Sequence, residues 1–252
     1  MLDQLDAIAR RGGTLALSHF RETSLHVEAK GRLDLVTDAD RAVERQLTAE
    51  LTAAFPEDGI IGEEGASIRP HAARQWIIDP IDGTLNYIRG MTDWAVSIGL
   101  LEDGKPRMGA VYAPIRDEML LGGSIEGGWL NGVSLPPLTP FDPTCGIISV
   151  SSATTTQPDL EARLIQHILA DHHFSYRSIG STAVSLIQLA QGQVDAALGM
   201  GAKAWDVMGG MAVVAGLGGA CSIDFSGHKV GAPIDYICGK PDTVNALSGL
   251  LA

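Results

Sequence analysis

The spacing of apolar residues changes twice along the 252 residues of this chain, and these changes restrict its fold more than any other feature. Apolar residues first recur at the helical interval, in the segments 2–12 and 43–54. Thr37 and Asp38 precede the second segment and suit its N-terminal cap, and Pro56 lies just beyond its end. The chain is therefore expected to begin with two amphipathic helices.

From residue 59 onward the pattern indicates short strands. Apolar runs are separated by turns rich in glycine, proline and aspartate, which is typical of strands joined by tight connections. We expect these strands at 59–62, 76–78, 95–101, 108–112 and 119–122. The first half is thus predicted to be helices that cover a largely antiparallel sheet.

A proline-rich stretch at 135–143 separates this pattern from a different one. Beyond it, strand and helix patterns alternate, which favours a layered α/β arrangement. We expect strands at 146–150, 176–179, 194–199 and 220–224, and helices at 158–170, 182–191 and 206–215. We place a boundary here, between an N-terminal α+β subdomain at 1–138 and a C-terminal α/β subdomain at 139–252.

Composition argues against several classes of protein. The formal net charge of −12 disfavours direct binding of nucleic acid, which depends on Lys and Arg to neutralise phosphates. No apolar run approaches the roughly 20 residues that span a bilayer, so no membrane association is expected. The three cysteines are widely spaced and indicate neither a disulfide framework nor a zinc site. Buried, reduced thiols and a cytoplasmic location are the expectation.

The segment W-I-I-D-P-I-D-G-T-L-N-Y, residues 76–87, carries the most chemical information. Asp79 follows an apolar run and is predicted at the end of a buried strand, where a carboxylate is costly without a counter-charge. Pro80 fixes a turn, and Asp82 returns a second carboxylate to the same side. Gly83 and Thr84 offer backbone amides and a hydroxyl, which suits a metal with a phosphate. Alternatively, these are ordinary turn and cap residues.

Further acidic residues lie in separate stretches of the chain. Glu63 and Glu64 follow a short apolar run, Asp40 follows another, and Asp206 precedes an apolar helix. Several carboxylates without histidine or cysteine among them favour Mg²⁺ over zinc, because Mg²⁺ takes oxygen ligands.

Four motifs together resemble those of the inositol monophosphatase family. They are D-L-V-T-D-A-D at 34–40, G-E-E at 62–64, the segment at 76–87, and A-W-D-V-M-G-G at 204–210, in the family's order. The resemblance implies an inositol monophosphatase or sugar phosphatase fold of alternating αβαβα layers. It also implies a phosphoric monoester hydrolase that uses Mg²⁺ to activate water, with inositol 1-phosphate or a related sugar or polyol phosphate as substrate.

The resemblance further implies roles for individual residues, with two or three Mg²⁺ per active site. Glu63, Asp79 and the Ile81 carbonyl would hold a first ion. Asp79, Asp82 and Asp206 would hold a second. The Thr84 hydroxyl, oriented by Asp40, would position a water that Glu63 helps to deprotonate. Substrate contacts would come from Asp82, Gly83, Thr84, Gly180, Ser181, Thr182 and Asp206. The first subdomain would carry most metal ligands, and the second would complete the site.

One position departs from the inositol-preferring pattern. Those members tend to carry an acid seven residues before the aspartate of the W-D pair, and here Gly199 stands there, with Lys203 nearby. Histidinol phosphate, fructose 1,6-bisphosphate and a 3′-phosphonucleotide are therefore alternative substrates. A regulatory, protein-binding role is a further alternative. The resemblance also implies a homodimer and inhibition by Li⁺.

Overall fold

The computed structural model describes the chain except for residues 23–25, 32–33, 153–157, 228 and 251–252. The helices are α1 (Leu2–His19), α2 (Asp38–Ala54), α3 (Thr84–Ile88), α4 (Pro158–Ala170), α5 (Thr182–Ala190), α6 (Ala204–Gly216) and α7 (Pro241–Leu247), followed by a 3-10 turn at Ser248–Leu250. A hairpin of β1 (Val27–Gly31) and β2 (Asp34–Thr37) leads into α2.

The larger sheet has eight strands, and all neighbours in it are antiparallel except β3 and β5. In spatial order they are β10 (Val133–Ser134), β9 (Gly127–Leu130), β8 (Glu118–Gly123), β7 (Lys105–Ala113), β6 (Ala95–Glu102), β5 (Arg74–Asp82), β3 (Gly59–Gly62) and β4 (Ser67–Ile68). The prediction of a largely antiparallel sheet is confirmed.

The smaller sheet has five strands and contains the parallel pairs of the molecule's second half. In spatial order they are β12 (Ser175–Arg177), β11 (Ile147–Ser152), β13 (Ala196–Ala202), β15 (Ile234–Gly239) and β14 (Ala220–Cys221). The strand β11 runs parallel to β12 and β13, whereas β15 runs antiparallel to β13 and β14.

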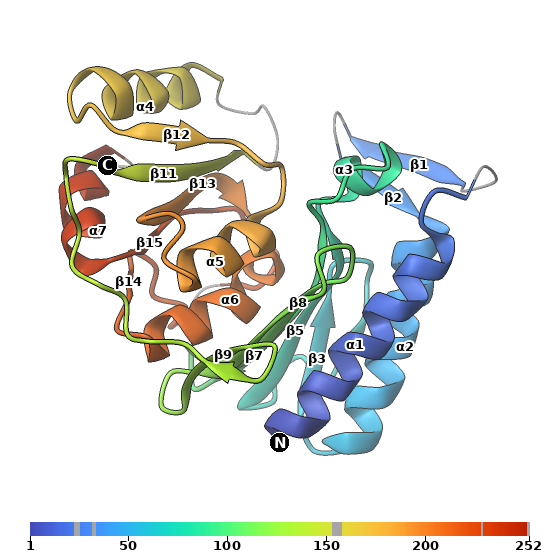
Figure 1. Ribbon diagram of the computed structural model, residues 1–252. Coiled ribbons are helices and arrows are strands. Elements are labelled where there is room, and N and C mark those ends of the chain that lie inside the picture. Colours follow the sequence, from blue (N-terminus) through green and yellow to red (C-terminus); the bar gives the residue numbers. More distant parts are fainter. Residues whose placement is uncertain (23–25, 32–33, 153–157, 228, 251–252) are drawn as a thin grey trace.

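Helices and sheets alternate in five layers (Figure 1). The first layer is α1 with α2, which pack on one face of the larger sheet. The helices α5 and α6 lie between the two sheets, and α4 and α7 cover the outer face of the smaller one. This arrangement confirms the expected α/β class with αβαβα layers.

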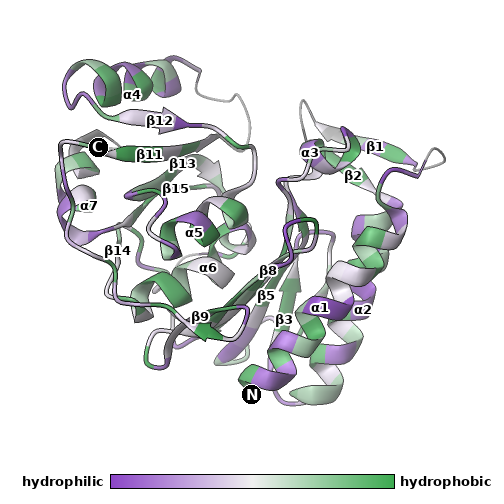
Figure 2. Cartoon of the chain, viewed as in Figure 1, coloured by the Kyte–Doolittle hydropathy of each residue, from purple (hydrophilic) through white to green (hydrophobic). Residues whose placement is uncertain are grey.

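The alternation of side chains along β5 shows how the layers are held together. Trp76 and Ile78 point into the core shared with α1 and α2, and Ile77 points into the core shared with α6. Both faces of this strand are thus buried, as the continuous apolar run W-I-I requires. Figure 2 shows α6 and most central strands coloured mainly hydrophobic, while α1, α2 and α4 mix hydrophobic and hydrophilic residues along their length.

Glycines allow α6 to approach the larger sheet closely. A Cβ atom at Gly109 of β7 would lie 2.2 Å from the carbonyl oxygen of Gly209 in α6. The backbones therefore meet where no larger residue fits. The Ser97 hydroxyl of β6 also donates to the Trp205 carbonyl in the first turn of α6, at 3.2 Å. These contacts fix the N-terminal end of α6, and so Asp206, against the sheet.

Several details differ from the sequence prediction. The strand expected at 220–224 ends at Cys221. At the next position the Ile237 amide of β15 donates to the Ser222 hydroxyl at 2.9 Å, so a side chain takes up the hydrogen bond of the ladder. The hairpin of β1 and β2 and the elements β4, β9, β10, β15 and α7 were not predicted. Cys145 and Cys221 are exposed, so the expectation of buried thiols holds only for Cys238.

The chain passes from the larger sheet to the smaller one between β10 and β11. This region contains the predicted boundary after residue 138. The division into two subdomains stays a prediction, since α6 packs against strands of both sheets.

Among the residues that the structure describes, no helix combines the length and the apolar character needed to cross a membrane.

Candidate active site

The end of β5 turns sharply between Asp79 and Asp82. Pairing with β6 shifts register between these two residues, and the Ile81 amide donates to the Asp79 carboxylate at 3.0 Å. The strand was predicted to end near Asp79, but it continues through this irregularity to Asp82. Both carboxylates are buried, with Asp79 2% and Asp82 7% exposed. The irregularity places two acids side by side within the protein.

Asp206 comes to the same place from the other half of the chain. It lies in the first turn of α6, where its carboxylate accepts from the Lys203 amide at 2.8 Å. One carboxylate oxygen from each of Asp79, Asp82 and Asp206 lies within 4.8 Å of the others. We call these three residues the acidic cluster. Segments far apart in the sequence thus converge on one point, as the sequence analysis expected.

The acidic cluster is electrostatically strained without a counter-charge. Burial, followed by the charges of Glu63 and Asp82, raises the pKa of Asp79 well above its usual value. Burial raises the pKa of Asp82 to about 6, and burial together with the charge of Asp82 raises the pKa of Asp206 to about 7. Carboxylates in such a place must either hold protons or share a cation. Because all the donors are carboxylate or carbonyl oxygens, the group fits a hard divalent cation such as Mg²⁺.

Glu63 and Asp40 lie around the cluster without belonging to it. The charges of both carboxylates contribute to the raised pKa of Asp79. The Glu63 amide donates to the Ile78 carbonyl at 3.2 Å, which places this residue beside β5. Asp40 is fully buried in the first turn of α2, where it forms a capping box with Thr37. Burial raises the pKa of Asp40 to about 6.

The turn after the cluster carries the predicted phosphate contacts. Gly83 has a φ of +91°, which glycine adopts readily, and Thr84 begins the short helix α3. The Thr84 hydroxyl lies 3.0 Å from the Ile81 carbonyl and 3.4 Å from the Asp40 carboxylate. It has one hydrogen to donate, so the two acceptors are alternatives. The predicted hydrogen bond from Thr84 to Asp40 can therefore form, but the Ile81 carbonyl competes for the same hydrogen.

Gly180, Ser181 and Thr182 meet this turn at the start of α5. The Ser181 hydroxyl and the Ala183 amide both donate to the Asp82 carboxylate, the amide at 2.9 Å. Ser181 also caps α5 by accepting from the Val184 amide. A Cβ at Gly83 would lie 3.2 Å from the Gly180 carbonyl. The two glycine-containing turns are therefore adjacent, and Asp82 joins them.

Two residues that the sequence analysis did not select hold these parts together. The Asn86 side-chain amide donates to the Asp93 and Ile179 carbonyls, each at 2.7 Å, and so ties α3 to the segment before Gly180. Glu44 accepts from the backbone after Glu63. Its position one helical turn after Asp40 is the signal that could have identified it. For Asn86, the sequence signal was its position within the motif at 76–87.

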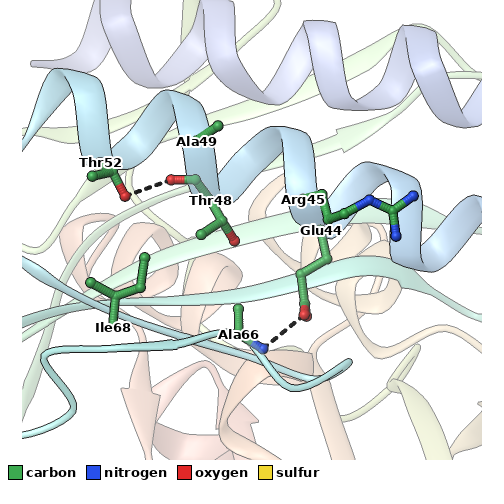
Figure 3. Close-up of a pocket in the computed structure, with 7 residues that line it drawn as sticks. All are labelled: Glu44, Arg45, Thr48, Ala49, Thr52, Ala66 and Ile68. Atoms are coloured by element: carbon green, nitrogen blue, oxygen red, sulfur yellow. Dashed lines mark hydrogen bonds between the residues drawn. The ribbon is translucent and has the colours of Figure 1, made fainter.

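A cavity of about 490 Å³ lies apart from the acidic cluster, between α2 and the turn before β4. Figure 3 shows its lining, which includes Glu44, Arg45, Thr48 and Ile68. None of the predicted site residues lines it, so the chemistry inferred from the sequence does not belong to this cavity.

Comparison with known proteins places the chain in a family. The model of the inositol monophosphatase family matches residues 1–249. Nus factor SuhB of Xylella fastidiosa is 34% identical over 222 residues, which are 87% of this chain and 80% of that protein. An inositol monophosphatase of Dictyostelium discoideum is 31% identical over 251 residues, 97% of this chain and 92% of that protein.

Solved structures agree with the sequence comparison. The crystal structure of extragenic suppressor protein suhB from Bartonella henselae matches with a TM-score of 0.89 and 25% identity, over 99% of this chain and 97% of that one. The expected fold is therefore confirmed. The chain belongs to the inositol monophosphatase family, which makes it a phosphoric monoester hydrolase.

Proposed function

We propose that this protein hydrolyses a small phosphate monoester in a Mg²⁺-dependent reaction, with inositol 1-phosphate or a related sugar or polyol phosphate as substrate. The observation that supports this proposal most is the acidic cluster itself. One oxygen from each of its three carboxylates lies within 4.8 Å of the others, with Asp79 and Asp82 buried and Asp206 partly exposed. Such an arrangement is stable in ionised form only with cations. Two or three Mg²⁺ ions per active site are proposed, as the family resemblance implies.

In this proposal the cluster and its surroundings hold the metal. Glu63, Asp79 and the Ile81 carbonyl would bind one ion, and Asp79, Asp82 and Asp206 another. Bound divalent cations supply positive charge to phosphoryl oxygens and lower the pKa of water. The raised pKa values of the carboxylates support this assignment, since burial and the neighbouring acids outweigh the nearby positive charge of Lys203.

The protein's own groups would orient the substrate. The amides of Gly83 and Thr84 lie beside the cluster, and Gly83 is free of a side chain that would cover them. The Thr84 hydroxyl would hold the attacking water when it donates to Asp40, and Glu63 would take up a proton from this water. Gly180, Ser181 and Thr182 would contact the alcohol part of the substrate, because they begin α5 next to the phosphate turn.

The space around Gly199 of β13 is relevant to the choice among substrates. A Cβ at Gly199 would lie 2.6 Å from the Tyr236 ring and 2.9 Å from the Ser151 carbonyl. An acidic side chain would therefore not fit at this position unless both Tyr236 and the Ser151 backbone moved. This supports the alternatives of histidinol phosphate, fructose 1,6-bisphosphate or a 3′-phosphonucleotide, in which recognition does not depend on an acid at Gly199.

Phosphate release from a panel of these substrates tests the proposal. Purified protein is assayed with Mg²⁺ or with a chelator, beside Asp82→Asn and the matched exposed control Asp103→Asn. We expect turnover that needs Mg²⁺, survives in Asp103→Asn and is lost in Asp82→Asn. The ratio kcat/KM ranks the substrates. Turnover that persists in the chelator contradicts metal dependence.

A regulatory role is the second candidate, and the name of the relative from Xylella fastidiosa, a Nus factor, favours it. It predicts that Asp82→Asn, although inactive, still supports the cellular process that fails when the gene is deleted. Loss of that process in Asp82→Asn would instead assign the process to the enzyme. A cytoplasmic location and a homodimer complete the proposal, and light scattering of the purified protein decides the oligomeric state.

A further inference from the structure

Glu44 makes an unusual set of contacts for a carboxylate buried in a helix. It lies on the inner side of α2 and is 6% exposed. One of its oxygens accepts from the Glu64 amide at 2.7 Å, and the other accepts from the Ala66 amide at 2.8 Å. Figure 3 shows the contact with Ala66. Both oxygens thus bind backbone of a single turn, and hydrogen bonds to an ionised acceptor are among the stronger ones.

The turn that Glu44 holds is the one that carries Glu63. The Glu63 amide donates to the Ile78 carbonyl at 3.2 Å, one residue before Asp79. The Gly62 amide donates to the Ala66 carbonyl at 2.9 Å and closes the turn. Glu63 therefore lies between an anchor on β5 and the anchor that Glu44 provides. Its backbone is fixed from both directions.

Gly62 permits this arrangement. A Cβ at position 62 would lie 2.2 Å from the Glu44 carboxylate. Because backbone and carboxylate meet at this distance, any larger residue would push Glu44 away from the turn. The close approach indicates that the position of Glu44 relative to the turn is tightly defined.

The helix α2 also holds the opposite side of the site. Asp40 precedes Glu44 by four residues, so both side chains lie on one helix face. Asp40 reaches toward Thr84, whereas Glu44 reaches the turn of Glu63. One rigid helix thus sets the distance between two groups that surround the acidic cluster.

We infer that Glu44 is a positioning residue for the metal site: it holds the Glu63 turn against β5 and so sets the affinity of the site for divalent cations. This inference rests on the proposed function, in which Glu63 is a metal ligand. Glu44 does not touch metal or substrate. Residues that orient metal ligands typically change metal affinity by about 10- to 100-fold when they are replaced.

The substitution Glu44→Gln tests the inference. It keeps the size of the side chain but turns one acceptor oxygen into an NH₂ group, which faces a backbone N–H and cannot accept from it. Two readouts apply. Amide hydrogen exchange at Glu64 and Ala66, measured by NMR on metal-free protein, reports the turn itself. Calorimetric titration with Mg²⁺ and with Mn²⁺ reports affinity independently of turnover.

We expect faster exchange at Glu64 and Ala66 in Glu44→Gln, and a Kd for Mg²⁺ that rises by about 10- to 100-fold. The matched control is Glu50→Gln on the same helix, since Glu50 accepts from Arg11 at the surface. It should leave Kd and exchange at the turn unchanged. If Glu44→Gln does not fold, Gly62→Ala perturbs the same contact with Glu44 intact and should raise Kd in the same direction.

The outcomes separate this inference from the proposed function. An unchanged Kd in Glu44→Gln and Gly62→Ala, with only the melting temperature lowered, would overturn the inference and leave phosphatase activity untouched. A wild-type protein that binds Mg²⁺ with Glu44-dependent affinity, but releases phosphate from no substrate, would uphold the inference and refute the proposed function. Absence of Mg²⁺ binding in the wild type would overturn both.

Discussion

Asp79 is the residue at which the need for a positive partner is greatest. It is 2% exposed, and its pKa is raised first by burial and then by the neighbouring charges of Glu63 and Asp82. A buried carboxylate surrounded by other carboxylates destabilises the fold, because each ionised group raises the free energy of its neighbours. This cost in folding free energy is consistent with a site in which a bound cation stabilises the carboxylates.

Replacement of Asp206 by asparagine should separate metal affinity from stability. Asn keeps the acceptor for the Lys203 amide but removes a charge from the acidic cluster. Asp206→Asn should therefore raise the melting temperature of metal-free protein and weaken Mg²⁺ binding by at least about tenfold. Thermal unfolding in a chelator and calorimetry measure the two effects. Asp159→Asn, in the exposed first turn of α4, is the control and should show neither. Equal Mg²⁺ affinity in Asp206→Asn and wild type would contradict the ligand assignment.

The same residue predicts a pH dependence. The pKa of Asp206 rises from 3.8 to about 7 on folding. Between about pH 4 and about pH 7 the folded state then holds a proton that the unfolded state has lost, so metal-free stability should fall as pH rises through this window. Urea unfolding in a chelator measures this fall. The difference between wild type and Asp206→Asn should grow with pH, and a difference independent of pH would contradict the prediction.

The contact of α6 with the larger sheet places Asp206, and it depends on glycine. In Gly109→Ala the new methyl group would press on the backbone of Gly209, whose carbonyl oxygen lies 2.2 Å from the ideal Cβ. We expect a loss of about 1–3 kcal/mol in the free energy of unfolding, together with weaker Mg²⁺ binding because α6 shifts. Denaturant unfolding and calorimetry measure both. Gly249→Ala, where a Cβ meets nothing within 4 Å, is the control. Stability equal to that of the control would show that the contact is looser than described.

Local patterns predicted the elements that are defined locally. The helix α4 was expected at 158–170 and occupies Pro158–Ala170, because its apolar interval and proline near the first turn both act within one segment. The strand β15 was missed. It is stabilised by pairing with β13 and β14, and nothing in its own six residues requires that pairing. The turn at Pro80 that brings Asp82 beside Asp79 was predicted from local residues, but its form as a register shift within a continuing strand was not, because that depends on pairing with β6.

For the molecule as a whole, the site lies where both halves of the chain meet. Asp79 and Asp82 come from the larger sheet, Asp206 comes from α6, and Ser181 of α5 donates to Asp82. The sequence motifs predicted which acids gather. They did not reveal Asn86 and Glu44, which act through backbone contacts that only the folded chain defines. Residue types thus indicated the chemistry, while the supporting contacts depended on tertiary structure.

Li⁺ should inhibit phosphate release by this enzyme, as the family resemblance implies. Li⁺ would compete for a position within the acidic cluster, so phosphate release should fall as Li⁺ rises at constant Mg²⁺. Steady-state assays with Li⁺ and, as the control for ionic strength, with Na⁺ measure the effect. Equal rates in the two salts would contradict this prediction and would indicate that Li⁺ does not displace Mg²⁺ here.

Calorimetric titration of the wild type and of Asp79→Asn with Mg²⁺ tests the central claim most directly, since Asp79 is shared by both proposed ions. Circular dichroism establishes that the variant is folded. We predict saturable binding to the wild type and none to Asp79→Asn under the same conditions. Equal binding to both proteins would show that the buried carboxylates do not hold the metal.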